Sequence, residues 1–104
     1  MTPLKPVHPG EILKHEFMEP LNLSSNGLAK AIGVTPARIN EIVRKRRGIT
    51  AETALRLAQY FGTDAQSWMN LQHHYELEVA QQTIGAEVAT IQPFNAMNKS
   101  LGTG

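Results

Sequence analysis

Apolar residues recur along this chain at helical spacing, and capping residues, prolines and glycines separate the apolar segments. The pattern predicts five helices, over residues 9–19, 25–32, 36–47, 51–61 and about 64–84. A proline at the first helical position opens the first and third helices, and Gly33, Gly48 and Gly62 follow the second, third and fourth. No segment has the pattern of a β-hairpin, so the predicted fold class is all-α.

The first four helices each carry an apolar face, and we expect these faces to share one core. They comprise Ile12, Leu13, Phe17 and Met18; Leu28, Ala29 and Ile32; Ile39, Ile42 and Val43; and Leu55, Leu57, Ala58 and Phe61. Thr63-Asp64-Ala65-Gln66 has the form of a capping box and predicts the start of the fifth helix at Thr63. From Gly85 the pattern weakens. We therefore expect one domain over 7–84 and a flexible tail over 85–104, with 87–92 as a possible short strand.

Composition excludes several classes of protein. The chain has 104 residues and no Cys, which argues against a disulfide scaffold, a thiol enzyme and a Cys-based metal site. No apolar run approaches the roughly 18 residues needed to span a bilayer, and the first residues lack the apolar segment of a signal peptide. A protein of the reducing cytoplasm, with no membrane partner, fits these features.

The net charge of +1 conceals an uneven distribution of charge. Residues 28–56 hold seven Lys or Arg residues and two acidic residues, whereas the rest of the chain is acidic on balance. A basic run alone is more often a solvated surface, but a basic middle on an acidic body suggests a polyanionic partner.

The segment from Ser25 to Arg44 has the residue spacing of a helix-turn-helix. Ala29 is small where two helices would cross closely, and Gly33 suits a left-handed turn. Val34, Ile39 and Ile42 would fill the wedge between the helices, and Thr35-Pro36 would start the second one. An ordinary helical hairpin would explain the glycine alone, but the complete spacing favours a helix-turn-helix whose second helix enters the DNA major groove.

Burial of the apolar face of the third helix turns its other side outward, toward a possible DNA partner. The candidate base-reading residues are Thr35, Ala37, Arg38, Asn40 and Glu41. Arg38 can donate two hydrogen bonds to guanine, and Asn40 can pair with adenine. Glu41 could accept from cytosine. We favour a role in orienting Arg38, Arg44 or Lys45, because an unpaired carboxylate beside phosphates is costly.

Candidate phosphate contacts surround this helix. They are Ser25 and Asn26 on the second helix and Arg44, Lys45, Arg46 and Arg47 at the end of the third. One basic residue there would merely complement the helix dipole, but four in succession exceed that need.

The fifth helix carries two apolar stripes. Trp68, Leu71, Tyr75 and Val79 form one stripe; Met69, Leu77, Ala80 and Ile84 form a second, roughly 140° away at about 100° per residue. The second stripe is our candidate homodimer interface, and a helix fully buried in one core is the equally weighted alternative.

The histidines give little support for metal binding or catalysis. His73 and His74 are adjacent and so point about 100° apart on a helix. His74 and Glu78 share a face, but zinc normally takes three or four ligands. His8 is expected to pack over the start of the first helix. We predict no metal site, no catalytic residue and no cofactor.

Three further segments narrow the helix-turn-helix resemblance, which by itself is to the Xre-type, phage-repressor-like family. His8-Pro9-Gly10-Glu11-Ile12-Leu13 resembles the opening of the HigA-type antitoxins of bacterial toxin–antitoxin modules. Residues 48–58 are similar to the segment that follows their recognition helix, and residues 68–77 resemble their Trp-Leu-x-Leu-Gln-x-x-Tyr-Asp-Leu signature. The resemblance covers about residues 7–81 and departs at Arg44–Arg47, where many relatives have a shorter basic turn with glycine.

The resemblance implies a compact five-helix, phage-repressor-like domain that acts as a cytoplasmic homodimer. It implies repression of its own operon at a palindromic operator in double-stranded DNA, and neutralisation of a RelE-like toxin that cleaves mRNA on the ribosome. The competing hypotheses are a stand-alone phage or restriction-control repressor and, more weakly, a structural or RNA-binding helical module.

Overall fold

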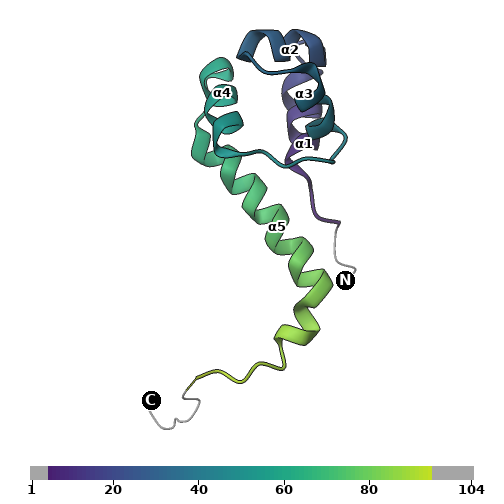
Figure 1. Ribbon diagram of the computed structural model, residues 1–104, viewed down its shortest axis with the longest axis vertical. Helices are drawn as coiled ribbons and strands as arrows, with labels where there is room; N and C mark the ends of the chain where they lie inside the picture. Colours follow the sequence, from purple (N-terminus) through teal and green to yellow (C-terminus); the bar gives the residue numbers. More distant parts are fainter. Residues whose placement is uncertain (1–4, 95–104) are drawn as a thin grey trace.

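The computed structural model describes residues 5–94, and the described chain is helical without a strand. Figure 1 shows the elements: α1 (Pro9–Ile12), continued by a π-helix, η1 (Leu13–Met18), then α2 (Ser25–Ile32), α3 (Pro36–Val43), α4 (Ala51–Phe61) and α5 (Ala65–Val88). The predicted all-α fold of five helical segments is confirmed. The predicted tail from residue 95 onward lies outside the described residues.

Side-chain caps start four of the helices. The side-chain oxygens of Ser24, Thr35, Thr50 and Asp64 each accept a hydrogen bond from the backbone N–H three residues later. The prediction for α5 was wrong by one residue, because Asp64 caps it. The Thr63 hydroxyl instead accepts a hydrogen bond from the Trp68 indole N–H at 2.9 Å.

Left-handed residues end α2, α3 and α4. Gly33 and Gly62 have φ of 77° and 72°, as the sequence predicts. The third helix ends at Val43, and its predicted continuation to Gly48 was wrong. Lys45 takes a left-handed φ of 65° there, and the Arg46 N–H donates to the Glu41 carbonyl at 2.8 Å, which closes the helix.

Two further expectations failed along the chain. The first helix is not α-helical throughout, because its second half is a π-helix for which the sequence gives no signal. Helix α5 runs past Ile84 and Gly85 to Val88. The predicted strand over 87–92 is therefore absent, and the N–H groups of Thr90 and Ile91 close a helical turn on Glu87 and Val88.

The core forms where α1 to α4 meet the first half of α5. Its buried apolar residues are Leu13, Met18, Leu28, Ala29, Ile32, Ile39, Ile42, Ile49, Ala54, Leu57, Ala58 and Trp68. The Phe17 ring lies 4.9 Å from that of Phe61 and 5.0 Å from that of Trp68. The predicted burial of Leu55 was wrong: Leu55 is exposed because Ala54, one residue earlier, lies on the inward face instead.

The molecule has a compact body and a projecting arm. Helices α1 to α4 form the body, and the second half of α5 extends from it as a lone helix (Figure 1). The principal extents are 59 × 28 × 22 Å. Among the described residues, no helix is long and apolar enough to cross a membrane.

Candidate DNA interface

Helices α2 and α3 meet as the spacing predicts for a helix-turn-helix. Ala29 is buried at the crossing, and its carbonyl accepts hydrogen bonds from Gly33 N–H at 2.9 Å and Val34 N–H at 3.0 Å. Ile39 and Ile42 are fully buried, so they fix which side of α3 faces the body. The opposite side of α3 is left for a partner.

The outward side of α3 carries most of the predicted base-reading residues. Ala37 is exposed, and Asn40 and Glu41 are half-buried on the same side of the helix. Thr35 is exposed, but its hydroxyl caps the helix by accepting from the Arg38 N–H at 3.2 Å. These side chains form a small mixed surface at the beginning and middle of the helix.

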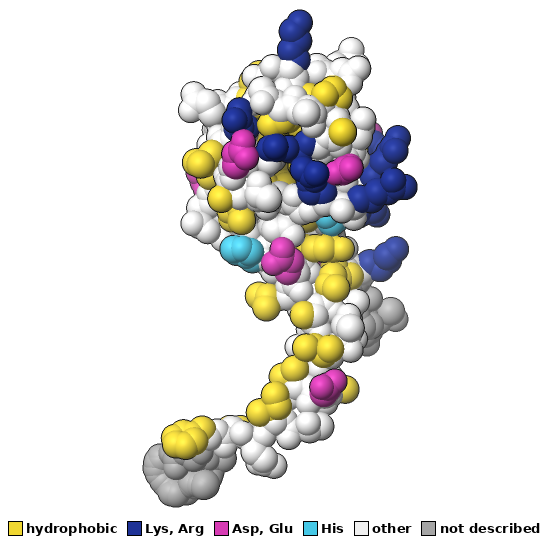
Figure 2. All heavy atoms as spheres, in the orientation of Figure 1, with side chains coloured by type: hydrophobic (Ala, Val, Ile, Leu, Met, Phe, Trp, Pro, Cys, Tyr) yellow, Lys and Arg dark blue, Asp and Glu magenta, His cyan; other side chains and the backbone are white. Residues whose placement is uncertain are grey.

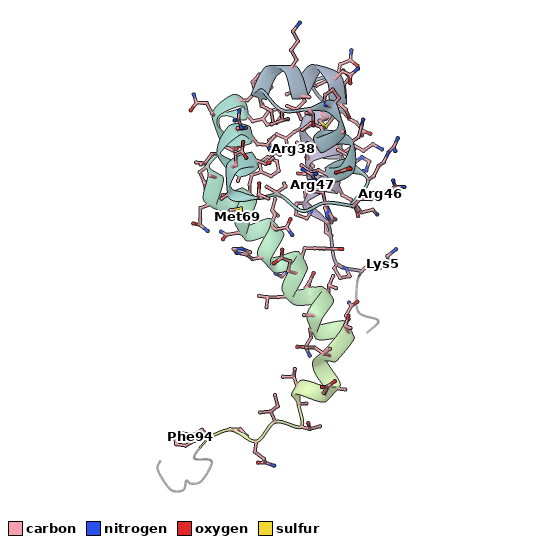
Figure 3. The ribbon with its side chains drawn as sticks, viewed as in Figure 1. Lys5, Arg38, Arg46, Arg47, Met69 and Phe94 are labelled. Carbon is pink, nitrogen blue, oxygen red and sulfur yellow. The ribbon has the colours of Figure 1, made fainter. Side chains whose placement is uncertain are left out.

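Arg38 lies toward α4 instead of outward. Its Nη1 donates to the Thr53 hydroxyl at 3.4 Å and lies 3.6 Å from a Glu52 carboxylate oxygen. The side chain is about one quarter exposed, 26% by area. Figure 3 shows Arg38 between α3 and α4, so in the free protein it is held at the edge of the outward surface. The sequence gives no direct sign of this contact with α4.

Glu41 orients a basic side chain, but its partner was predicted wrongly. Its carboxylate lies 3.0 Å from Nε of Arg47, and not beside Arg38, Arg44 or Lys45. The helix ends at Val43 and the chain reverses at Lys45, which returns Arg47 toward Glu41.

The connection from α3 to α4, residues 44–50, is named the basic loop here. Arg44, Lys45, Arg46 and Arg47 are all exposed in it. The Lys45 ammonium pairs with Glu11 of α1 at 3.2 Å. Arg46 points away from the body in Figure 3, and Figure 2 shows Lys and Arg side chains gathered on the body, away from the far half of α5.

The first turn of α2 holds the two predicted polar phosphate contacts. Asn26 is exposed and Ser25 is half-buried. The neighbouring Ser24 hydroxyl is already engaged, since it accepts from the Gly27 N–H at 3.0 Å. Free N–H groups and polar side chains at a helix N-terminus suit a phosphate.

The start of α1 is fixed against α3. His8 is buried, its Nδ1 accepts from the Gly10 N–H at 2.9 Å, and its ring lies 4.7 Å from that of Tyr75, so its predicted packing is confirmed. Burial, helped by the Lys45 charge and opposed by Glu11, lowers the pKa of His8. A Cβ at Gly10 would collide with the Ile42 carbonyl oxygen, so glycine permits this close approach.

No group of three His, Cys, Asp or Glu side chains could hold a metal ion within residues 5–94. His74 pairs with Glu78 alone, Nε2 to carboxylate oxygen at 3.3 Å. Met69, one of the predicted interface residues, packs partly buried against the core, whereas Leu77, Ala80 and Ile84 are exposed.

Comparison with known proteins places this geometry in a family. The helix-turn-helix family model matches residues 15–68. Virulence-associated protein I of Dichelobacter nodosus is 62% identical over 76 residues, which cover 73% of this chain and 70% of that protein. Antitoxin HigA-1 of Vibrio cholerae is 32% identical over 103 residues, 98% of this chain and 97% of that protein.

A solved structure of the Pseudomonas aeruginosa antitoxin HigA with the higBA promoter matches with a TM-score of 0.83 and 46% identity, over 86% of this chain and 98% of that one. The fold and the α2–α3 geometry are thus those of an Xre-type helix-turn-helix protein. Within that class, this chain belongs to the HigA-type antitoxins.

Proposed function

We propose that this chain is the antitoxin of a toxin–antitoxin module, with two binding activities and no catalytic one. As a homodimer it represses its own operon by binding a palindromic operator, and it neutralises a cognate RelE-like toxin that cleaves mRNA. Both partners act in the cytoplasm, where we place this protein.

The observation that carries the DNA activity is the outward side of α3 next to the basic loop. Thr35, Ala37, Asn40 and Glu41 lie at the beginning and middle of α3, where recognition helices meet base edges. Arg38 joins them as a base reader once it leaves Thr53. Arg44, Lys45, Arg46 and Arg47, with Ser25 and Asn26, then bind phosphates and set the register. The P. aeruginosa antitoxin HigA with its promoter supports this assignment.

The homodimer is supported by the apolar arm. Leu77 and Ile84 are 71% and 46% exposed on one side of a helix that leaves the body, and Ala80 lies beside them. Gln81 and Val88 lie on the same side, and positions 77, 81, 84 and 88 have the alternating four- and three-residue spacing of coiled coils. A lone helix with such a stripe is marginal in water, so pairing with a second copy would stabilise it.

The toxin activity rests on family membership, because no described surface identifies the toxin by its chemistry. Its test is co-expression of the chain with the reading frame adjacent to its gene. We expect the two products to co-purify and the neighbour, expressed alone, to arrest growth and degrade mRNA. A neighbour that is neither toxic nor bound would leave a stand-alone repressor.

Operator binding is tested separately on the DNA upstream of the gene. We expect footprinting to show two symmetric half-sites about one helical turn apart, protected by a homodimer. Equal affinity for the upstream DNA and for random DNA would contradict sequence-specific repression.

A further inference from the structure

Gln72 joins the arm-bearing helix α5 to the basic loop. Its side chain is buried, although it is polar and lies on a helix of which much is exposed. Its Oε1 accepts a hydrogen bond from the backbone N–H of Ile49 at 2.7 Å, and its Nε2 donates to a carboxylate oxygen of Glu76 at 2.7 Å. Both ends of the amide are therefore engaged, one with the loop and one with its own helix.

The loop is shaped to receive this amide. A Cβ at Gly48 would lie 2.7 Å from Nε2 and 2.8 Å from Oε1 of Gln72, closer than real Cβ atoms come to other atoms. The next residue, Ile49, is buried in the core, so its N–H is out of contact with water. Without Gln72 this N–H would lose its partner, which is costly for a buried donor.

The two ends of the basic loop are held by different means. At the α3 end the backbone suffices, because the Arg46 N–H donates to the Glu41 carbonyl at 2.8 Å and the Lys45 N–H to the Ile42 carbonyl at 3.0 Å. At the α4 end, the loop backbone is held by the side chain of Gln72, from a distant part of the chain. Arg46 stands at the first attachment, and Arg47 lies between the two.

We infer that Gln72 is a positioning residue for DNA binding: it fixes the basic loop so that Arg46 and its neighbours meet phosphates without first being ordered. The inference rests on the proposed function in taking the basic loop as a phosphate contact. It also gives α5 a direct connection to the proposed DNA-binding side of the body, shortly before the exposed stripe begins at Leu77.

The test uses variants that keep the net charge, because charge alone changes affinity for DNA. Gln72→Met removes the acceptor, and Gly48→Ala displaces the amide from the opposite side. For either one we expect the free loop to relax and operator affinity to fall by about tenfold, because ordering the loop on DNA would again leave the buried Ile49 N–H without a partner. The slope of log affinity against log salt should fall by about 1 per protomer for each phosphate that the loop ceases to bind. Gln66→Met, whose amide bonds Asn70 on the exposed side of the same helix, should change neither quantity.

Rescue separates positioning from general loss of structure. In the double variant Gln72→Glu with Glu76→Gln, the carboxylate accepts from both the Ile49 N–H and the new amide, at the same net charge. We expect it to regain most of the affinity and the salt slope. If the affinity and salt slope of the double variant were no higher than those of Gln72→Met, the inference would be overturned.

Hydrogen exchange of the Ile49 amide provides a readout that needs no DNA. Its exchange in the free protein should accelerate in Gln72→Met and Gly48→Ala and slow again in the double variant. Unchanged exchange would show that Gln72 does not hold the loop, and a folded Gln72→Met protein with wild-type affinity and slope would show that it does not position the loop for DNA. If the wild-type chain failed to bind its operator, the proposed function would fall, and the exchange experiment would still decide whether Gln72 holds the loop.

Discussion

Arg38 illustrates how the fold engages a side chain that we propose to contact DNA. It stands on the recognition helix, but its guanidinium contacts Thr53 and Glu52 at the start of α4. Glu52 in turn bonds Arg56 at 3.1 Å, and Arg56 donates to the Ile32 carbonyl at 2.8 Å. To read a base, Arg38 would have to leave this network, so the contacts of the free protein would compete with the proposed contacts to DNA.

The substitution Arg38→Ala distinguishes these roles. We expect a loss of about 1–3 kcal/mol on the operator, because a guanidinium that reads guanine contributes that much discrimination. The loss on random DNA should be smaller. Binding measured on both DNAs, with urea unfolding of the free protein, checks this.

Equal losses on the two DNAs would make Arg38 a phosphate contact, and a loss of stability without loss of affinity would leave it a purely structural residue. Glu52→Gln weakens the competing network and should change operator affinity in the opposite direction. The exposed Glu16→Gln serves as its charge-matched control.

Lys45 occupies a backbone conformation that glycine adopts more easily. Its φ of 65° is left-handed, and its ammonium pairs with Glu11 at the half-exposed surface. In Lys45→Gly we expect the free energy of unfolding to rise by about 0.5–1 kcal/mol, because relief of the left-handed strain exceeds the value of a surface ion pair.

The same substitution should weaken DNA binding. The loss of one positive charge from the basic loop lowers the salt slope by about 1 per protomer if Lys45 contacts a phosphate. Urea unfolding of Lys45→Gly should show higher stability, and salt titrations of its DNA binding should show lower affinity. A Lys45→Gly protein that is less stable than the wild type and binds DNA as tightly would contradict both the strain at Lys45 and its contact with a phosphate. Arg46→Ala, with no left-handed residue replaced, is the control for charge alone.

At the scale of elements, the sequence predicts well what local chemistry determines. Thr35 starts a helix, and Gly33 and Gly62 end helices, as predicted, because caps and left-handed turns need only neighbouring residues. The end of α3 was misplaced because Lys45 takes the position expected for Gly48. The extension of α5 through Gly85 was missed because glycine disfavours a helix interior but does not forbid one.

In the candidate site, too, the sequence predicted local features and missed tertiary contacts. Spacing identified α3 and its outward side, since burial of Ile39 and Ile42 fixes the helix orientation. It could not identify partners brought together by the tertiary fold: Arg38 with Thr53, Glu41 with Arg47, and Gln72 with Ile49. In the sequence, Gln72 stood out only as a member of the family signature over residues 68–77.

The cap of α1 makes stability dependent on pH. His8 is buried and acts as the acceptor for Gly10, so its neutral form is favoured and its pKa lies below the ordinary 6.5. Protons therefore bind the unfolded chain more readily than the folded one. The stabilisation by neutral His8 is complete above about pH 6.5 and is lost as the pH falls toward the lowered pKa.

The variant His8→Asn keeps a capping acceptor but cannot titrate. We expect the free energy of unfolding of the wild-type chain to decline as the pH falls below about 6.5, and that of His8→Asn to decline less. Urea unfolding at intervals across this range measures both curves. His73→Asn, on an exposed part of α5, should follow the wild type, and parallel curves for His8→Asn and the wild type would refute the assignment.

At the scale of the whole molecule, the body and the arm differ in the residues that they expose. The body holds the core and the proposed DNA-binding side, whereas the arm holds few charged residues and a line of apolar ones, visible along the lower helix in Figure 2. One helix-turn-helix contacts only a few base pairs, so an arm that joins two bodies would set the spacing of two half-sites.

Charge on the stripe of the arm would oppose its pairing with a second copy. Placing glutamates on its stripe, in Leu77→Glu with Ile84→Glu, should convert a dimer to a monomer in light scattering, because like charges would then face each other without apolar burial. The body should remain as stable as before, since both residues lie on exposed positions. Operator affinity should fall by at least about tenfold as the second half-site becomes a separate binding event.

Ala86 provides the control, since it lies on the opposite side of the same turns. Ala86→Glu adds charge to the arm and should leave both the mass and the operator affinity unchanged. If the double variant remained dimeric, the two bodies would have to be joined elsewhere, and the arm would lose its part in spacing the half-sites.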